Sequence, residues 1–363
     1  YHIYHDQGSK VERRYWDVPN TKDFRIENEE DLIRELSEKV VSAVNDWAIT
    51  DVPLGAFLSG GVDSSLISAI LSQEIENLKT YTIGYSEKGF NEFEFARKVS
   101  NHIGSEHTEL SDDLKSYNEN WDKLIALKDA PLSVPNEVPL AVMCDELRKD
   151  ITVVISGEGA DELFGGYGKI FRLPYELYKS NLNQNMFDAF IDEYSYMSKG
   201  FLSKHFKNQS HSFEEKVKKV LESSMDNQDF MYRVFHSIHI KGLLARVDMT
   251  SMQASIEARP PFLNHELVEY VYENIPNSLK LKWKDKTPPK TLSPKDYSEV
   301  FDIPKYLLKK VAEEFIPEDI IYRKKMGFPV PLDDWFNDLL NQLDMKSKVF
   351  ERILASDDSH ENF

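Results

Sequence analysis

The sequence predicts an α/β fold: a doubly wound parallel sheet of about five strands flanked by helices, with a largely helical C-terminal half. Runs rich in β-branched residues alternate with segments of helical periodicity over the first 155 residues. Residues 151–155 form an unbroken apolar run, which is typical of a strand buried on both faces. Two predicted strands lead directly into glycine-containing turns. Because such folds bind ligands beyond the carboxyl ends of their strands, these turns are the first candidates for a site.

Each element follows from its residues. Apolar residues at helical spacing, preceded by acidic residues suited to a helix N-terminus, predict a first helix that ends near Trp47. The first strand ends at Leu58, and a helix has begun by Leu66. Residues 280–297 are rich in Lys, Pro, Thr and Ser without periodicity, and they predict an exposed loop. The other predicted elements are strands over 80–85, 106–110 and 151–155, helices over 92–102, 213–221 and 265–272, a helix ending near 149, and a frayed end over 355–363.

Composition limits the classes of function. The chain has 363 residues, of which 41% are hydrophobic and 29% charged, as in an ordinary soluble globule. Its formal net charge of −18 argues against sequence-independent binding to nucleic acid, which needs a basic surface. Its apolar runs are shorter than the roughly 18 residues of a membrane span. The single cysteine, Cys144, excludes an internal disulfide and a cysteine-based zinc site, and predicts a buried thiol in a cytoplasmic protein. The oligomeric state stays open, a homodimer included.

The most informative turn is the S-G-G-V-D-S-S segment over 59–65, which lies between a strand and a helix. Such a junction aims several backbone N–H groups and the positive end of the helix dipole at one point, which suits pyrophosphate. No G-K-[ST] follows, so the turn lacks the lysine of a P-loop. An acidic side chain stands instead where a magnesium ion would accompany pyrophosphate. The alternative is a plain connection with a serine N-cap. The residues concerned are Ser59, Gly60, Gly61, Asp63, Ser64 and Ser65.

A second glycine-containing turn, over 156–167, follows the apolar strand and carries three carboxylates. Asp161 lies 98 residues after Asp63, yet neighbouring parallel strands would bring the two turns to the same sheet edge. Two carboxylates converging on one pyrophosphate repel each other unless a cation lies between them, and magnesium prefers such a site. The sequence therefore predicts that Asp63 and Asp161 bind Mg²⁺. The alternative is that these acidic side chains are merely solvated.

These two turns and the segments 84–110, 251–263 and 323–332 closely resemble, in the family's order, the synthetase domain of glutamine-dependent asparagine synthetases. That domain belongs to the PP-loop ATP pyrophosphatase superfamily. The resemblance covers nearly all of the chain from residue 29, which implies a synthetase domain over 29–363 whose part from 170 onward is mainly helical. It also implies that residues 1–28 are a linker from an N-terminal glutaminase domain that this chain lacks. Without that domain, the chain is expected to use free ammonia and not glutamine.

The resemblance implies an activity and a set of site residues. The family uses ATP and magnesium to convert the β-carboxylate of aspartate to an acyl-adenylate, which ammonia attacks to give asparagine, AMP and pyrophosphate. Glu158 matches the family's glutamate near the adenylate, where it could accept a proton from ammonia. Lys325, and less clearly Lys305, match lysines near the phosphates. Carried over by motif, pyrophosphate would be bound by Ser59, Gly60, Gly61, Asp63, Ser64 and Ser65, magnesium by Asp63 and Asp161, and adenosine by the backbone at Leu58, Ile83, Ser156 and Gly157.

Some segments depart from the family pattern. Residues 129–136 and 246–249 lack charged or hydroxyl residues that are usual in the family, so the acceptor is either aspartate or another carboxylate such as a sugar acid or a peptide. Arg259 is a candidate ligand of the substrate carboxylate, or alternatively a structural partner of Glu257. The lysines that begin the predicted helix after residue 304 are interpreted for the most part as a solvated face: Lys305, Lys309 and Lys310.

Three other functions are alternatives to the amide ligase. A cyclase of the β-lactam synthetase type is disfavoured by Glu158, since the family resemblance implies a tyrosine there for that reaction. A tRNA-thiolating enzyme would need a basic face and catalytic cysteines. A nucleotide-binding regulator without catalysis is disfavoured by the retention of Asp63, Glu158 and Asp161.

Overall fold

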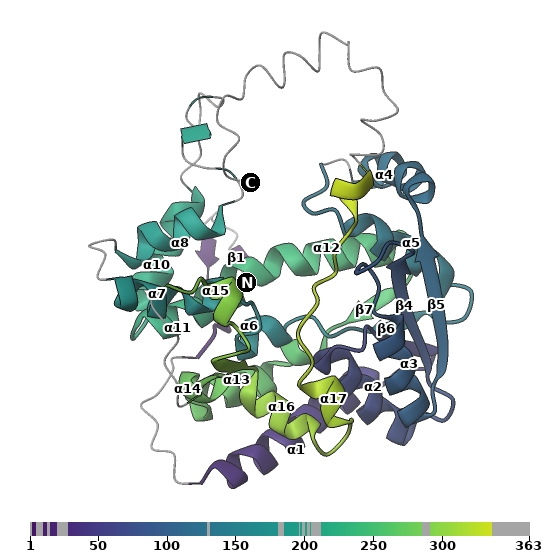
Figure 1. Ribbon diagram of the computed structural model, residues 1–363, viewed down its shortest axis with the longest axis horizontal. Helices are drawn as coiled ribbons and strands as arrows, with labels where there is room; N and C mark the ends of the chain where they lie inside the picture. The colour runs from purple at the N-terminus through teal and green to yellow at the C-terminus, as the bar shows by residue number, and fades with distance from the viewer. Residues whose placement is uncertain are drawn as a thin grey trace.

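The computed structural model of the chain describes residues 2–4, 10–12, 15–19, 28–128, 131–180, 185–195, 197, 200, 201, 204, 212–284 and 291–335. Its centre is a five-stranded sheet in the order β5-β4-β3-β6-β7, and every neighbouring pair is parallel. The predicted fold class is thereby confirmed (Figure 1). The strands of this sheet are β3 (Leu54–Phe57), β4 (Lys79–Tyr85), β5 (Glu106–Asp112), β6 (Val153–Ile155) and β7 (Glu257–Arg259).

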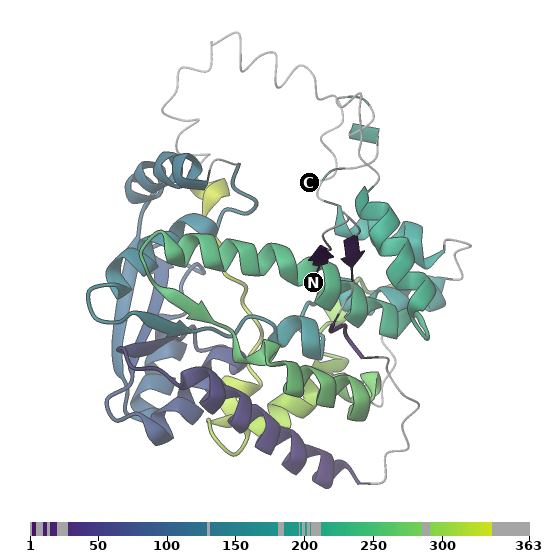
Figure 2. The same ribbon diagram turned by 180° about the vertical axis from the view of Figure 1, so that it is seen from behind.

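Helices cover both faces of the sheet. The first face carries α1 (Glu29–Ala48), α2 (Val62–Glu74) and α3 (Phe93–Ile103), and the second carries α5 (Glu137–Leu147) and α12 (Ile240–Met252) (Figures 1 and 2). Consecutive residues of β6 alternate between the two cores, because successive side chains of a strand point to opposite faces. The apolar run therefore has the two-sided burial that the sequence predicts.

The second half of the chain is mainly helical, as predicted. Helix α11 (Asn227–Val234) continues through a π-helical turn, η2 (Phe235–His239), into α12, which reaches from the helical part to the sheet (Figures 1 and 2). π-Turns of this kind often occur at functional sites. The other helices are α4 (Leu114–Lys128), α6 (Ala160–Phe164), η1 (Ile170–Arg172), α7 (Leu173–Ser180), α8 (Met186–Tyr194), α10 (Ser212–Ser223), η3 (Pro261–Leu263), α13 (His265–Asn274), α14 (Asn277–Lys280), α15 (Pro294–Tyr297), α16 (Tyr306–Ala312) and α17 (Glu318–Ile321).

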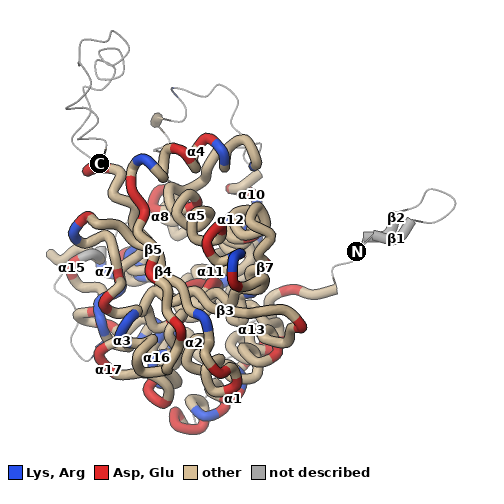
Figure 3. The backbone as a smooth tube through the Cα atoms, turned by 90° about the vertical axis from the view of Figure 1, so that its right-hand side faces the viewer, with Lys and Arg blue, Asp and Glu red and all other residues tan. Residues whose placement is uncertain are grey.

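Two small antiparallel pairs accompany the main sheet: β1 (His2–Tyr4) with β2 (Lys10–Glu12), and β8 (Leu281–Trp283) with β9 (Asp302–Pro304). In the view of Figure 3, basic positions are interspersed with acidic ones over the described chain. None of the helices within the described residues combines the length and apolar character needed to cross a bilayer.

The prediction of an exposed loop over residues 280–297 is wrong at its beginning, whereas residues 291 and 293 are exposed and lie outside helices and strands, as predicted, before a short helix. Lys280 is fully buried, and its ammonium lies 4.5 Å from the ring centre of Tyr232 and 4.7 Å from that of Tyr272. The segment continues as β8, and its far end forms α15. Its aromatic residues explain the difference, since Trp283 packs against Tyr175 at a centroid distance of 4.4 Å. Residues 285–290 and the predicted frayed end over 355–363 lie outside the described residues.

Candidate active site

The two turns lie side by side at the carboxyl edge of the sheet. Strands β3 and β6 are parallel neighbours, with Ala56 opposite Ile155, so the segments that follow them leave the sheet together. A Cβ atom placed on Gly157 would lie 3.2 Å from the Cβ of Asp63 and 3.3 Å from the backbone nitrogen of Ser64. A glycine at 157 therefore permits this close approach. The chain order of the strands changes direction between β3 and β6, which is where doubly wound folds bind their ligands.

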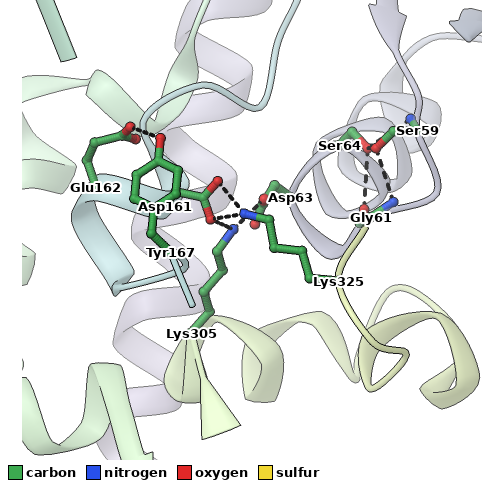
Figure 4. Close-up of polar contacts among 9 residues, drawn as sticks. All are labelled: Ser59, Gly61, Asp63, Ser64, Asp161, Glu162, Tyr167, Lys305 and Lys325. Carbon is green, nitrogen blue, oxygen red and sulfur yellow. Dashed lines mark hydrogen bonds and ion pairs between the residues drawn. The ribbon is translucent and has the colours of Figure 1, made fainter. Parts of the chain in front are cut away.

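The first turn presents unsatisfied donors. Helix α2 begins after Gly61 with no side-chain cap, so the serine N-cap of the alternative interpretation is not formed. Instead, the Ser59 hydroxyl accepts a hydrogen bond from the N–H of Gly61 at 3.2 Å, and the Ser64 hydroxyl accepts one from the N–H of Ser59 at 3.2 Å. These bonds fix the shape of the turn while leaving the first N–H groups of α2 available to an anion (Figure 4). Gly60 takes the left-handed φ of 70°, and a Cβ there would lie 2.6 Å from the backbone of Phe95.

Two lysines form ion pairs with Asp63 and Asp161, the carboxylates that are predicted to bind magnesium (Figure 4). The ammonium of Lys305 lies 2.5 Å from Asp63 Oδ2 and 2.6 Å from Asp161 Oδ1. Lys325 approaches Asp161 from another segment, with distances of 2.5 and 2.6 Å to its two carboxylate oxygens. Burial alone would raise the pKa of Asp161, but the two lysines hold it below its ordinary value. A Cβ on Gly166 would lie 1.7 Å from Asp161 Oδ1, so this cluster requires a glycine at 166.

The residues at this point fit a magnesium ion. The second carboxylate oxygen of Asp63, Oδ1, is buried and accepts no hydrogen bond. Within the described residues, no three or more His, Cys, Asp or Glu side chains gather as a protein-only metal cage. A pair of carboxylates that share the ion with phosphate oxygens and water is the arrangement that magnesium favours. Asp63 and Asp161 have the spacing for it, because one ammonium already bridges them.

Glu158 follows β6 and faces α12. Its Oε1 accepts a hydrogen bond from the guanidinium of Arg246 at 2.8 Å, and the same guanidinium reaches Asn136 Oδ1 at 3.2 Å. Burial raises the pKa of Glu158, and Arg246 opposes that rise. Arg246 is a site residue that the sequence analysis missed. Its segment, 246–249, is considered in the sequence analysis only for lacking residues that are usual in the family, whereas the useful signal was the arginine that begins it.

A second arginine supports the first turn. Arg323 donates from Nε to the carbonyl of Gly60 at 2.8 Å and forms an ion pair with Glu92. Its guanidinium also lies 4.5 Å from the ring centre of Phe95. Arg323 begins the 323–332 segment already identified by resemblance, yet only Lys325 of that segment was predicted to act. Arg323 thus ties this segment to the turn that it faces.

The carboxylate next to Asp161 has a different role. The hydroxyl of Tyr167 donates to Glu162 Oε1 at 2.5 Å, and burial raises the pKa of Glu162 to about 7. The Tyr167 ring lies 5.3 Å from the ammonium of Lys325, so the hydrogen bond to Glu162 holds an aromatic ring beside that lysine (Figure 4). Glu162 itself does not line the cavity.

A cavity of about 790 Å³ joins these groups. Its lining includes the apolar residues Phe57, Leu140 and Met143, which suit a nucleotide base, and it also includes residues of α8 and η2. Gly60, Ser65 and Arg259 do not line it. Most of the predicted residues do: Leu58, Ser59, Gly61, Asp63, Ser64, Ile83, Ser156, Gly157, Glu158, Asp161, Lys305 and Lys325.

Arg259 belongs to a structural ion pair. It lies on edge strand β7, where its Nε binds Glu257 at 2.8 Å. Its Nη1 donates to the carbonyls of Trp47 and Ile49 at the end of α1, at 3.1 and 2.9 Å. These three groups hold the guanidinium, and Arg259 does not line the cavity. Arg259 therefore forms the ion pair with Glu257 that the structural alternative names, and its candidate role as a ligand of the substrate carboxylate stays a prediction.

The interpretation of the lysines after residue 304 as a solvated face is wrong for two of the three. Lys305 is 3% exposed and Lys309 is 7% exposed, and both line the cavity. Lys310 alone has the predicted character, with its ammonium 2.8 Å from Glu313 at the surface. Cys144, by contrast, is a fully buried core thiol as predicted.

Comparison with known proteins places this site in context. The sequence model of the asparagine synthase family matches residues 35–353. Asparagine synthetase [glutamine-hydrolyzing] 1 of Bacillus subtilis (strain 168) is 32% identical over 352 residues, covering 87% of this chain and 52% of that protein. Asparagine synthetase [glutamine-hydrolyzing] 3 of the same organism is 30% identical over 336 residues, covering 87% and 51%. Amidase chry2 of Gibberella zeae is 23% identical over 388 residues, covering 88% and 56%. The chain spans about half the length of the curated relatives it matches.

Proposed function

Because the chain belongs to the asparagine synthase family, we propose that it activates the β-carboxylate of aspartate with ATP and passes it to ammonia, giving asparagine, AMP and pyrophosphate. As a family member it is a carbon–nitrogen ligase. One observation carries the proposal. The turns over 59–65 and 156–167 meet where uncapped N–H groups, two aspartates and two lysines surround one end of a cavity.

The first step is adenylation. A carboxylate oxygen of the acceptor attacks the α-phosphorus of ATP, and the bond to pyrophosphate breaks. Negative charge then grows on the phosphoryl oxygens and on the leaving group. The N–H groups at the start of α2 and the ammonium groups of Lys305 and Lys325 face that charge. Removing one donor of this kind typically costs about 2.7–4 kcal/mol of transition-state stabilisation. A magnesium ion held by Asp63 and Asp161 would add Lewis-acid stabilisation of the departing pyrophosphate.

The second step is amide formation. Ammonia attacks the acyl carbon, AMP leaves with the bonding electrons, and the nitrogen must lose a proton. Glu158 lines the same cavity and has a raised pKa, which suits a carboxylate that accepts this proton. Arg246 holds the carboxylate from α12 and so fixes its direction. The curated relatives named as glutamine-hydrolyzing suggest a glutaminase domain as the ammonia source. Cytoplasmic location and a homodimer remain predictions from sequence.

The test is AMP release by the purified chain with ATP, magnesium, ammonium and one carboxylate at a time. We expect AMP and pyrophosphate in equal amounts, and asparagine, only when aspartate is present. Hydroxylamine in place of ammonium should trap the adenylate as a hydroxamate. ATP binding without AMP release for any carboxylate would instead favour a nucleotide-binding regulator.

A second candidate is amide formation on another carboxylate. Two observations favour it: Arg259 is held outside the cavity, and Asn136 stands in a segment that departs from the family pattern and binds Arg246. Aspartate needs a cation for its α-carboxylate, and the one predicted for that task is engaged elsewhere. Sugar acids and peptide carboxylates therefore belong in the same panel, and AMP release with one of them but not with aspartate would select this candidate.

A further inference from the structure

Lys309 is a buried cation that neither the sequence analysis nor the proposed reaction uses. It lies on α16 one turn after Lys305, and its N–H donates to the Lys305 carbonyl at 2.8 Å. Residues four apart share one face of a helix, so both side chains emerge toward the cavity. Lys309 is only 7% exposed and lines that cavity.

The charges around the cavity are mostly balanced in pairs. Lys305 and Lys325 neutralise the two aspartates, and the two arginines at the site are each paired with a glutamate. Lys309 differs, because within the described residues no carboxylate lies at ion-pair distance from its ammonium. Its nearest aromatic contact is the Tyr322 ring, 5.6 Å away. Two further carboxylates line the cavity. Glu193 pairs with Lys169 at 2.7 Å, and Glu299, the first of the charges that act on Lys309, accepts a hydrogen bond from the backbone N–H of Lys325 at 3.1 Å.

An ammonium that is buried without a direct ion-pair partner gains electrostatic energy from an arriving anion. Its desolvation cost has already been incurred in the folded protein, so binding an anion recovers electrostatic energy at little further cost. Burial does lower the pKa of Lys309, which agrees with such a position. The charged groups that act on Lys309 are Glu299 first, then Lys305, Asp63 and Asp302, so its ammonium lies near the end of the cavity that holds Lys305 and Asp63.

We propose that Lys309 binds the leaving pyrophosphate, as a cation for its phosphate oxygens in addition to Lys305 and Lys325. This inference rests on the proposed function, since it assigns a residue to the leaving group of that reaction. Lys305 and Lys325 are largely committed to Asp63 and Asp161, and a pyrophosphate that carries several negative charges needs positive charge beyond theirs. Lys309 supplies it from inside the cavity.

The experiment compares Lys309→Met with Lys310→Met. Methionine keeps an apolar side chain for packing and removes the charge, and Lys310 is the adjacent residue, paired with Glu313 outside the cavity. Isothermal titration with inorganic pyrophosphate, with and without magnesium, and separately with AMP, gives the affinities. For Lys309→Met we expect pyrophosphate binding to weaken about 10–100-fold, the range for loss of a charge-assisted hydrogen bond. AMP binding should be unchanged, and Lys310→Met should match the wild type.

The outcomes separate this inference from the proposed function. If wild-type protein binds neither pyrophosphate nor AMP, the proposed function fails. If it binds both and Lys309→Met binds pyrophosphate equally well, only the role of Lys309 is refuted. A parallel loss of AMP and pyrophosphate affinity would show a structural role and would also refute it. Lys309→Arg, which keeps the charge, should restore most of the pyrophosphate affinity.

Discussion

Asp161→Asn tests the charge cluster at the centre of the site. Asp161 is the residue that both lysines share: Lys305 binds one of its oxygens and Lys325 binds both. Asparagine has nearly the same shape, so the substitution removes charge with little loss of packing. Lys305 keeps Asp63 as a partner, whereas Lys325 loses its carboxylate. Residue 161 then no longer supplies a negative charge for magnesium.

The expected cost in stability follows from burial. Removing one partner of a buried ion pair typically destabilises a protein by about 3–5 kcal/mol. The Lys325 side chain is 37% exposed and regains water, and Lys305, only 4% exposed, stays paired with Asp63. We therefore expect a smaller loss, about 2–3 kcal/mol in the free energy of unfolding at neutral pH. Carboxylate-dependent ATP–pyrophosphate exchange should be abolished.

The pH dependence gives an independent check. The lysines lower the pKa of Asp161 in the folded protein, so the folded state holds this carboxylate ionised where the unfolded chain would protonate it. The stabilisation is therefore complete above the ordinary pKa of 3.8 and declines as the pH falls below it toward the folded-state pKa. The difference in unfolding free energy between wild type and Asp161→Asn should be constant near neutrality and shrink in acid.

Urea unfolding at several pH values measures this difference. Asp319→Asn is the matched control, because Asp319 is an exposed aspartate with one lysine partner, Lys98, at 2.8 Å. We expect the control to leave the unfolding midpoint unchanged. The reasoning is refuted if Asp161→Asn is as stable as the control, or if its deficit does not diminish on acidification. Full pyrophosphate exchange by Asp161→Asn would separately refute the magnesium assignment.

Three further substitutions or probes test other parts of the site. Glu158→Gln should retain aspartate-dependent pyrophosphate exchange while amide formation falls about 100-fold, as expected when a general base is lost; equal loss of both steps would contradict the assignment. Arg246→Met removes the group that lowers the pKa of Glu158, so the acid limb of the pH–rate profile for amide formation should move to higher pH; an unmoved limb would exclude Glu158 as the titrating base. Cys144, whose thiol pKa is raised by burial to about 12, should resist iodoacetamide in the native protein and react on unfolding in urea; rapid native labelling would show that the thiol is accessible.

The sheet and the meeting of the two turns could be predicted because both depend on local patterns. The apolar run over 151–155 identifies a two-sided strand, and each turn is contiguous in sequence with its strand. Parallel topology then brings Asp63 and Asp161 to one edge without further information. Strand β7 was not predicted as a strand, because its three residues, Glu257–Arg259, have no β-like composition and pair only with β6 at the edge.

The partners of the carboxylates could not be derived from local pattern. Lys305 lies 242 residues after Asp63, and Arg246 lies 88 residues after Glu158. A lysine-rich helix start resembles a solvated face until the packing of α16 is known, because lysine is nearly always exposed. The same rule misled the interpretation of Lys280, whose burial depends on the rings of Tyr232 and Tyr272. Arg259 is the opposite case. Its motif is specific to the family, but its guanidinium binds Glu257 and the last carbonyls of α1, which ties the edge strand to that helix.

The backbone at Lys305 links the fold to the chemistry. This residue precedes α16 with φ 55° and ψ 37°, a left-handed conformation that costs an ordinary side chain roughly 1–2 kcal/mol relative to glycine. A glycine would relieve that cost, so the lysine must be stabilised by what its side chain does. The side chain lies between Asp63 and Asp161, where it offsets the repulsion that would otherwise separate the two turns. Backbone strain of this size is commonly found where a functional side chain is held in place. The ammonium thus holds the two carboxylates together, so that under the proposed function the binding of magnesium and pyrophosphate would exchange one cation arrangement for another and would not have to assemble the site.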